Sequence, residues 1–196
     1  MCSMPICAAT DGGARMSGDK HVLFLRGINV GGRNILPMAA LRDVLTGLGL
    51  RDVATHIQSG NVVFRAPAAA SDLADRIGAA IEEQFGFRPV VMVLNAQVLA
   101  QVLAANPFSD EGAAEAAKVQ IGFLARPASD AALADLTALA ATDERLHLTE
   151  LAFYLHAPSG IGRSKLAAQA ERLLGVPMTM RNFRVATKVF ALTEAD

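Results

Sequence analysis

The chain has 196 residues, of which 52% are hydrophobic and 19% are charged, and its formal net charge at pH 7 is −1. This length and composition are typical of a globular protein that buries a core without disulfide or metal cross-links. The basic residues are concentrated in two segments, 20–34 and 158–188. That pattern argues against a uniformly basic nucleic-acid binder.

Residues 1–19 are expected to form a flexible leader, because they lack the basic start and apolar core of a signal peptide. Met16 is an alternative translation start. The only two cysteines, Cys2 and Cys7, lie in this leader, which argues against a disulfide framework. The four histidines show no helical pairing with a carboxylate or thiol, so we expect no metal site.

The first half of the chain alternates apolar runs of strand and helix periodicity, separated by turn residues. Ser59, Gly60 and Asn61 lie between two short β-rich runs and predict a hairpin turn. Ser71 and Asn95 are expected to cap helices. The expected strands are 21–26, 53–58, 62–65 and 90–94. The expected helices are 37–49, 71–85 and 95–103.

The longest uncharged stretch covers residues 89–109. It contains asparagine, glutamine and proline residues, each of which is costly in hydrocarbon. We therefore expect no membrane partner and a cytoplasmic location.

The second half of the chain repeats the order of the first. Residues 55–67 and 146–158 align without a gap, with His56 over His147 and Pro67 over Pro158. The expected strands are 118–125, 145–149, 152–156 and 177–180. The expected helices are 130–140, 164–174 and 182–192. Because Tyr154 and His156 share one face of a strand, we expect them on a partly exposed sheet surface.

An internal repeat of roughly 90 to 100 residues follows from this order. The sequence therefore predicts an α+β protein in which two ferredoxin-like βαββαβ units in tandem form one compact molecule. The expected boundaries are residues 1–19 for the leader, 20–105 for the first unit plus a helix, 106–117 for a linker, and 118–194 for the second unit plus a helix.

Four sequence blocks stand out beyond this pattern. They are L-R-G-I-N-V-G-G-R-N at 25–34, I-Q-S-G-N-V-V-F at 57–64, G-I-G-R-S-K-L at 160–166 and R-N-F-R-V-A-T-K at 181–188. Their order resembles the signature blocks of the bacterial domain-of-unknown-function 1697 family, over about residues 20–194. Phe183 stands where that family more often carries tryptophan. The resemblance implies paired ferredoxin-like units and a shared surface, but no activity.

The first block joins a predicted strand to a predicted helix through glycines. Glycine permits positive φ and close approach of a ligand, and a helix start favours an anion. The spacing matches neither a Walker A loop nor G-x-G-x-x-G, and we expect no cofactor. The alternative is a tight crossover loop whose asparagines satisfy the local backbone. The candidate ligand-binding residues are Arg26, Gly27, Asn29, Gly31, Gly32, Arg33 and Asn34, with Gln58 as a further polar contact.

The third block repeats this arrangement before a helix that Ser164 can cap. Arg163 and Lys165 flank the helix start, where cations oppose the helix dipole unless an anion lies between them. The candidate residues are Gly160, Gly162, Arg163, Ser164 and Lys165. The alternative is a solvated turn whose long side chains extend into water.

The fourth block adds Arg181, Asn182, Arg184 and Lys188 to the candidates. If a helix begins at Asn182, the three cations lie on one face without an acidic partner and repel one another. An external anion would relieve that repulsion. The alternative is a solvated charged face.

Catalysis has no convincing set of residues, because Ser164 and the adjacent Lys165 diverge on a helix and no carboxylate lies in the glycine-rich blocks. Whether the chain is an enzyme therefore stays open. The leading hypothesis is a protein that binds a phosphate- or carboxylate-bearing small molecule or nucleotide, which requires the blocks to converge. The alternatives are a nucleic-acid-binding module that contacts backbone phosphates, and a structural or regulatory protein that dimerises. The sequence does not fix the oligomeric state.

Overall fold

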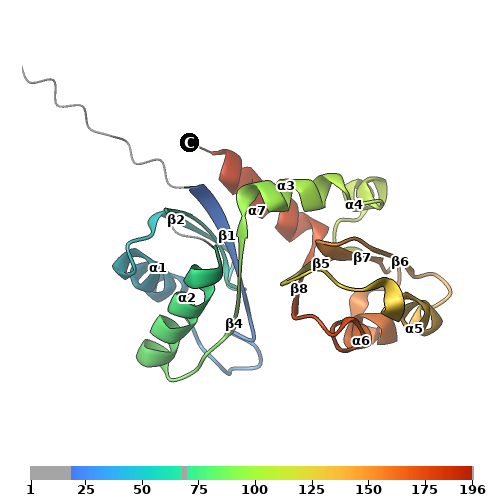
Figure 1. Ribbon diagram of the computed structural model, residues 1–196, viewed down its shortest axis with the longest axis horizontal. Helices are drawn as coiled ribbons and strands as arrows, with labels where there is room; N and C mark the ends of the chain where they lie inside the picture. Colours follow the sequence, from blue (N-terminus) through green and yellow to red (C-terminus); the bar gives the residue numbers. More distant parts are fainter. Residues whose placement is uncertain (1–18, 68–69, 196) are drawn as a thin grey trace, which may run out of the picture.

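The computed structural model describes residues 19–67 and 70–195. It contains two four-stranded antiparallel sheets, one in each half of the chain (Figure 1). Residues 1–18 of the predicted leader, which include both cysteines, lie outside the described residues. Asp19, the last residue of the predicted leader, is already the first residue of β1.

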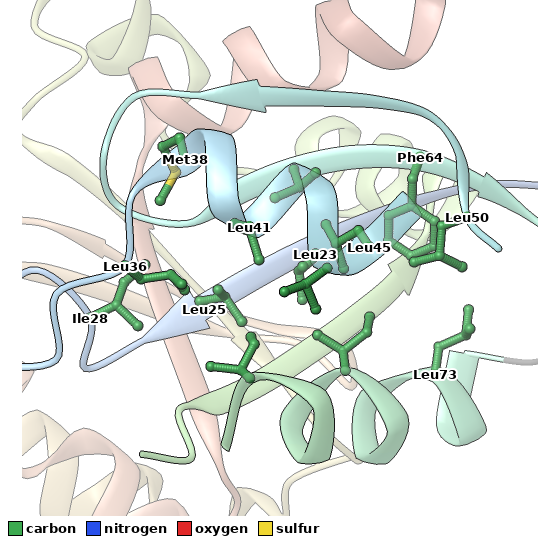
Figure 2. Close-up of a cluster of buried hydrophobic side chains, with 14 of the residues drawn as sticks. Leu23, Leu25, Ile28, Leu36, Met38, Leu41, Leu45, Leu50, Phe64 and Leu73 are labelled. Atoms are coloured by element: carbon green, nitrogen blue, oxygen red, sulfur yellow. The ribbon is translucent and has the colours of Figure 1, made fainter. Parts of the chain in front are cut away.

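The first unit is a βαββαβ sequence whose sheet has the strand order β2-β3-β1-β4. Its elements are β1 (Asp19–Arg26), α1 (Met38–Gly47), β2 (Arg51–His56), β3 (Asn61–Ala66), α2 (Ala70–Phe85) and β4 (Val90–Asn95). Apolar side chains from β1 and β3, including Leu23, Leu25 and Phe64, pack against α1 and α2 on one face of the sheet (Figure 2).

The second unit has the equivalent strand order, β6-β7-β5-β8. Its elements are β5 (Val119–Leu124), the 3-10 turn η1 (Asp130–Ala132), α5 (Leu133–Leu139), β6 (Arg145–Leu148), β7 (Ala152–His156), the 3-10 turn η2 (Ile161–Arg163), α6 (Lys165–Leu174) and β8 (Met178–Asn182). Helices α5 and α6 bury a separate core against one face of this sheet. The predicted pair of ferredoxin-like units is confirmed.

Each unit ends in an additional helix, α3 (Ala96–Ala104) or α7 (Phe183–Glu194). Asn95 is the N-cap of α3, as predicted, and Asn182, expected inside the last helix, is the N-cap of α7. Their side chains accept backbone N–H bonds of 2.8 and 2.9 Å. Figure 1 shows the two helices crossing between the sheets, each directed toward the opposite unit. No helix within the described ranges is long and apolar enough to cross a membrane.

The two sheets share an apolar layer that contains these crossing helices. Phe24 of β1 and Phe123 of β5 occupy equivalent strand positions, and their ring centroids lie 4.7 Å apart. Leu99, Val102, Ala186 and Val189 of α3 and α7 are buried in the same cluster. The open face of each sheet is therefore covered by the other unit and by the crossing helices together.

Tyr154 is part of this shared layer, so the prediction of a partly exposed sheet residue is wrong for it. The side chain is fully buried, its hydroxyl donates a 2.8 Å bond to the Val102 carbonyl, and burial raises its pKa. The reason is that α3, which belongs to the first unit, crosses over the second. Patterns within the second unit alone do not predict that a helix of the first unit buries Tyr154.

The repeat alignment is correct for β3 and β7 but shifts in the neighbouring strands. Asn61 and Ala152 both pair with the equivalent phenylalanines of the central strands. His56, however, pairs with Asn61, whereas His147 pairs with Tyr154. The two histidines are therefore not equivalent in the sheets, because the connection between β2 and β3 is longer than that between β6 and β7 and the register of the two strand pairs differs by two residues. Ile57 and Gln58, expected in a strand, belong to this longer turn, and Ile57 has a positive φ of 50°.

The predicted linker contains a short helix, α4 (Ser109–Ala114), preceded by the buried Phe108. Glu111 of α4 forms an ion pair with Arg145 of β6, which lowers the pKa of the Glu111 carboxyl. The Arg145 guanidinium also lies 5.0 Å from the centroid of the Phe108 ring. The segment is therefore docked on the second unit.

We expect Phe123→Ala to lower the free energy of unfolding by about 3 to 5 kcal/mol, as large truncations in closed cores do. Because Phe123 contacts Phe24 across the shared layer, both units should unfold in one transition at a lower urea concentration, followed by far-ultraviolet circular dichroism. Val90→Ala, at a half-exposed strand position, is the control and should change stability by less than about 0.5 kcal/mol. Two transitions with one unchanged would contradict a shared core.

Candidate functional site

The first block forms a small projecting hairpin, which we call the finger (residues 27–36). The Arg33 N–H donates to the Val30 carbonyl at 3.0 Å across Gly31 and Gly32, whose φ values are 57° and 74°. Positive φ at both central residues is the geometry of a type I′ turn, and glycine adopts it without strain. The glycines thus build a tight turn, in agreement with the crossover-loop alternative.

The finger is fixed at its base by two asparagines and two apolar anchors. The Asn29 side chain donates to the Leu36 carbonyl at 3.0 Å and to the Gln58 carbonyl at 2.9 Å, and accepts from the Leu36 N–H at 2.8 Å. Asn34 donates to the Gly27 carbonyl at 2.7 Å. Ile28 and Leu36 are buried beside Leu25 (Figure 2). The finger is consequently attached to the core rather than loosely connected.

The turn between β2 and β3 packs tightly against the end of β1. The Leu25 N–H donates to the Gly60 carbonyl at 2.8 Å. A Cβ atom at Gly60 would lie 2.6 Å from the Leu25 Cβ and 2.8 Å from the Ile28 Cδ1, and the φ of Gly60 is 69°. Glycine is required there for close approach as well as for its backbone conformation.

Arg181 joins this corner of the first unit to β8 of the second. Its Nε donates to the Asn61 Oδ1 at 2.6 Å, and its Nη2 donates to the carbonyls of Leu25 and Ser59 at 2.6 and 3.1 Å. The guanidinium lies 5.2 Å from the centroid of the Phe24 ring. Burial lowers the pKa of Arg181 to about 10, so the side chain keeps its charge at neutral pH.

The helical wheel placed Arg181 on one face with Arg184 and Lys188, and this prediction is wrong for Arg181. Strand β8 extends to Asn182, and strand alternation turns Arg181 toward the first unit. Arg184 and Lys188 are exposed on α7. Among the described residues, neither of these two cations has an ion pair or a side-chain hydrogen bond.

Arg26, at the end of β1, also connects the two units. Its Nη1 forms an ion pair with Glu171 of α6 and donates to the Met178 carbonyl at 2.8 Å. Glu171 in turn accepts a 3.3 Å bond from the Met178 N–H. Arg26 is thus neutralised by the protein's own carboxylate and stabilises the contact between units.

The third block lies in a different place and lines an open cleft of about 880 Å³ at the start of α6. The cleft is formed by two connections at one end of the second sheet, the one between α5 and β6 and the one between β7 and α6. Its lining residues are Ala138, Leu139, Ala140, Ala141, Asp143, Glu144, Ser159, Gly160, Gly162, Arg163, Ser164 and Lys165.

The positive side of the cleft is the α6 N-terminus. The buried Ser164 is the N-cap, and its hydroxyl accepts the Ala167 N–H at 3.0 Å. Arg163 and Lys165 are exposed, and neither has an ion pair or side-chain hydrogen bond with any described residue. These cations therefore add to the positive end of the helix dipole instead of being compensated.

The lining of the cleft also includes two acids that sequence reasoning missed. Asp143 accepts a 2.7 Å bond from the Ser159 hydroxyl, and this bond lowers the pKa of the Asp143 carboxyl. Glu144 accepts from the Ala141 N–H at 2.9 Å. The signal that could have found them is topological, because in a ferredoxin-like unit these two connections lie at the same end of the sheet.

The candidate residues thus fall into separate groups. The side chains of Arg26, Asn29, Asn34 and Arg181 hold the finger, the hairpin turn and the two units together, partly through the carbonyls of Gly27 and Gln58. Asn182 caps α7. Gly31, Gly32 and Arg33 are exposed on the finger, and Arg184 and Lys188 on α7. Five residues of the third block line the cleft. Helix α6 separates its N-terminal cleft from the Arg26 contact at Glu171, so the blocks do not form one common pocket.

Residues 19–154 match the family model described as a protein of unknown function (DUF1697), a span of more than half of the chain. The chain belongs to the DUF1697 family. The first two signature blocks lie within the matched span, and the last two follow it.

Similarity to a solved structure extends beyond that span. The conserved bacterial protein SP0830 from Streptococcus pneumoniae is 25% identical to this DUF1697 chain, with a TM-score of 0.68. The match covers 89% of this chain and 98% of that one. No match to a curated protein was found. Neither description names a ligand or an activity, so the function has to be argued from the geometry.

We expect Arg181→Ala to destabilise the protein by about 3 kcal/mol, because it leaves buried carbonyl and amide acceptors without their donor. Arg184→Ala, three residues further along and exposed, is the matched control and should cost less than about 0.5 kcal/mol. Urea unfolding measures both. Equal effects would mean that the buried hydrogen bonds of Arg181 do not stabilise the junction.

Gly60→Ala and Gly31→Ala separate close packing from backbone conformation. Both glycines have positive φ, but only the Cβ at Gly60 meets neighbouring atoms. We expect Gly31→Ala to cost about 1 to 2 kcal/mol from the left-handed conformation alone. Gly60→Ala should cost about 3 kcal/mol or more, because overpacking adds to the strain. Similar melting temperatures for the two variants would count against the tight contact with Leu25.

Proposed function

We propose that this protein binds an anionic small molecule, such as a sugar phosphate or nucleotide, in the cleft at the start of α6. The observation that carries the proposal is the placement of Arg163 and Lys165. Both are uncompensated cations beside a helix N-terminus, and both line a cleft of about 880 Å³. This volume is within the usual range for small-molecule sites, roughly 300 to 1,000 Å³.

Backbone donors support the same assignment. Ser164 caps the Ala167 N–H, which leaves the first helical amides, those of Lys165 and Leu166, with no acceptor among the described residues. Free amides at a helix start bind phosphate and carboxylate groups well. An anion there would also remove the unfavourable interaction of two cations with the positive end of the dipole.

The remaining lining residues of the cleft restrict the ligand further. Asp143 and Glu144 are acceptors that would repel a second anionic group, whereas the segment 138–141 is an apolar wall of alanine and leucine. A molecule with one anionic group and with hydroxyl or amine donors elsewhere can bind the cations and the acids at the same time. Sugar phosphates and nucleoside monophosphates have this distribution of groups, and inorganic phosphate does not.

A thermal-shift titration with sugar phosphates, nucleoside monophosphates and inorganic phosphate tests the proposal. A ligand at 100 times its Kd should stabilise the protein by about 2.7 kcal/mol. In the double variant Arg163→Ala/Lys165→Ala, the affinity should fall at least tenfold, since hydrogen bonds to charged groups contribute about 1.5 to 3 kcal/mol each.

The matched control is Arg184→Ala/Lys188→Ala, which removes two exposed cations from α7 and should leave the affinity unchanged. If this control abolishes binding while the cleft variant retains it, the anion binds on α7 and the assignment to the cleft is wrong. If none of the three ligand classes stabilised the protein, that result would also count against the proposal.

A further inference from the structure

A second surface, remote from the cleft, groups three exposed aliphatic residues around the finger. Val30, Ile35 and Ile57 are 68%, 57% and 52% exposed, the highest values among the described large hydrophobic residues. The Asn29 side chain binds both the Leu36 and the Gln58 carbonyl, and thereby holds the finger against the hairpin turn that carries Ile57. We call Val30, Ile35 and Ile57, together with Arg33, the finger patch.

The second unit shows that the fold does not require the finger patch. Its equivalent connection, from β5 to η1, spans only residues 125–129, and its β6–β7 turn is shorter than the β2–β3 turn. Both units nevertheless have the same strand order. The finger and the longer turn are thus additions to the first unit alone.

One of these additions also has an energetic cost. Ile57 has a φ of 50°, which is strained for a β-branched side chain. Exposure of the side chain removes the burial that could offset this cost within the protein. Strain of this kind is concentrated at binding surfaces.

The charge around the patch determines what can cover it. The Arg33 side chain is exposed, and its guanidinium has no ion pair or hydrogen bond with any described residue. Helix α1 starts directly behind the finger, and its N-cap is Pro37, with no side-chain capping bond and no acid in the first turn. This end of the molecule is therefore both aliphatic and positive.

Two other kinds of partner fit this surface less well. Nucleic acid binding needs several phosphate contacts, and the patch supplies one unpaired cation and no aromatic ring for stacking. A second copy would bring two positive ends together, and three aliphatic side chains bury far less than the roughly 1,200 Å² of a stable interface. A short segment that supplies carboxylates beside aliphatic side chains matches both properties.

We propose that the finger patch docks a short acidic and aliphatic segment of another protein. Its aliphatic side chains would cover Val30, Ile35 and Ile57. Its carboxylates would pair with Arg33 and lie near the α1 N-terminus. This assignment is independent of the cleft.

Selection from a random twelve-residue peptide library displayed on phage tests the proposal on the full chain. The wild type should enrich peptides rich in both Asp or Glu and aliphatic residues. A fluorescein-labelled consensus peptide should bind by fluorescence anisotropy. Its Kd should rise at least fivefold in Val30→Ser/Ile35→Ser and in Arg33→Glu. Leu133→Ser, which alters an exposed leucine of α5, is the control and should bind like the wild type.

The substituted residues are exposed, and circular dichroism should show that each variant keeps its fold. Enrichment of basic or uncharged peptides, or equal affinity in Val30→Ser/Ile35→Ser, would overturn the proposal. The proposal would also be overturned if sedimentation showed that the wild type is a dimer and that Val30→Ser/Ile35→Ser is a monomer, because the patch would then bind a second copy. Binding of a single-stranded oligonucleotide that Arg33→Glu abolishes would overturn it in favour of nucleic acid.

Discussion

The stability of the fold depends on burying the face of each sheet that its own two helices, α1 and α2 or α5 and α6, do not cover. A four-stranded sheet with two helices buries one face and leaves the other apolar surface exposed. Here the two open faces approach each other around Phe24 and Phe123, and α3 and α7 fill the space between them. Each crossing helix starts on one unit and packs on the other. Neither half of the chain can therefore complete its core alone.

The polar residues at the junction follow from this arrangement. Arg26 and Arg181 both reach from one unit to the other, but they are satisfied differently. Arg26 meets a carboxylate, whereas Arg181 is bound by carbonyl and amide oxygens at the end of β1 and in the hairpin turn. A guanidinium held in this way positions the finger, which is attached to the same turn through Asn29. The exposed patch is thus aligned by contacts between the two units.

Much of the fold could be predicted from sequence because the signals are local. The predicted helix caps at Asn95 and Ser164 follow from short polar side chains before apolar periodicity, and both are found. Ser71, also expected as a cap, lies inside α2, which already begins at Ala70. The repeat was visible because both units use the same order of elements. The burial of Tyr154 could not be predicted, because it depends on a helix from the other unit.

The candidate residues were harder to interpret for a related reason. Glycine and asparagine in the first block indicated unusual backbone correctly, since Asn29 and Asn34 both have positive φ. Composition alone does not distinguish an anion-binding loop from a type I′ turn. Arg181 was misplaced because extending β8 by two residues turned its side chain inward. The acids of the cleft were missed because Asp143 and Ser159 meet only after folding.

Lys20 introduces a constraint on the order of assembly. Its Nζ donates to the Thr193 and Ala195 carbonyls at 2.6 and 2.8 Å, so the first strand binds the end of the last helix. During synthesis, α3 follows the first sheet directly, but the part of the shared layer that α7 contributes is absent until residues 183–194 have been made. Completion of the first unit's apolar layer therefore depends on a segment more than 80 residues further along the chain, which makes this a contact of high sequence separation and slows its formation.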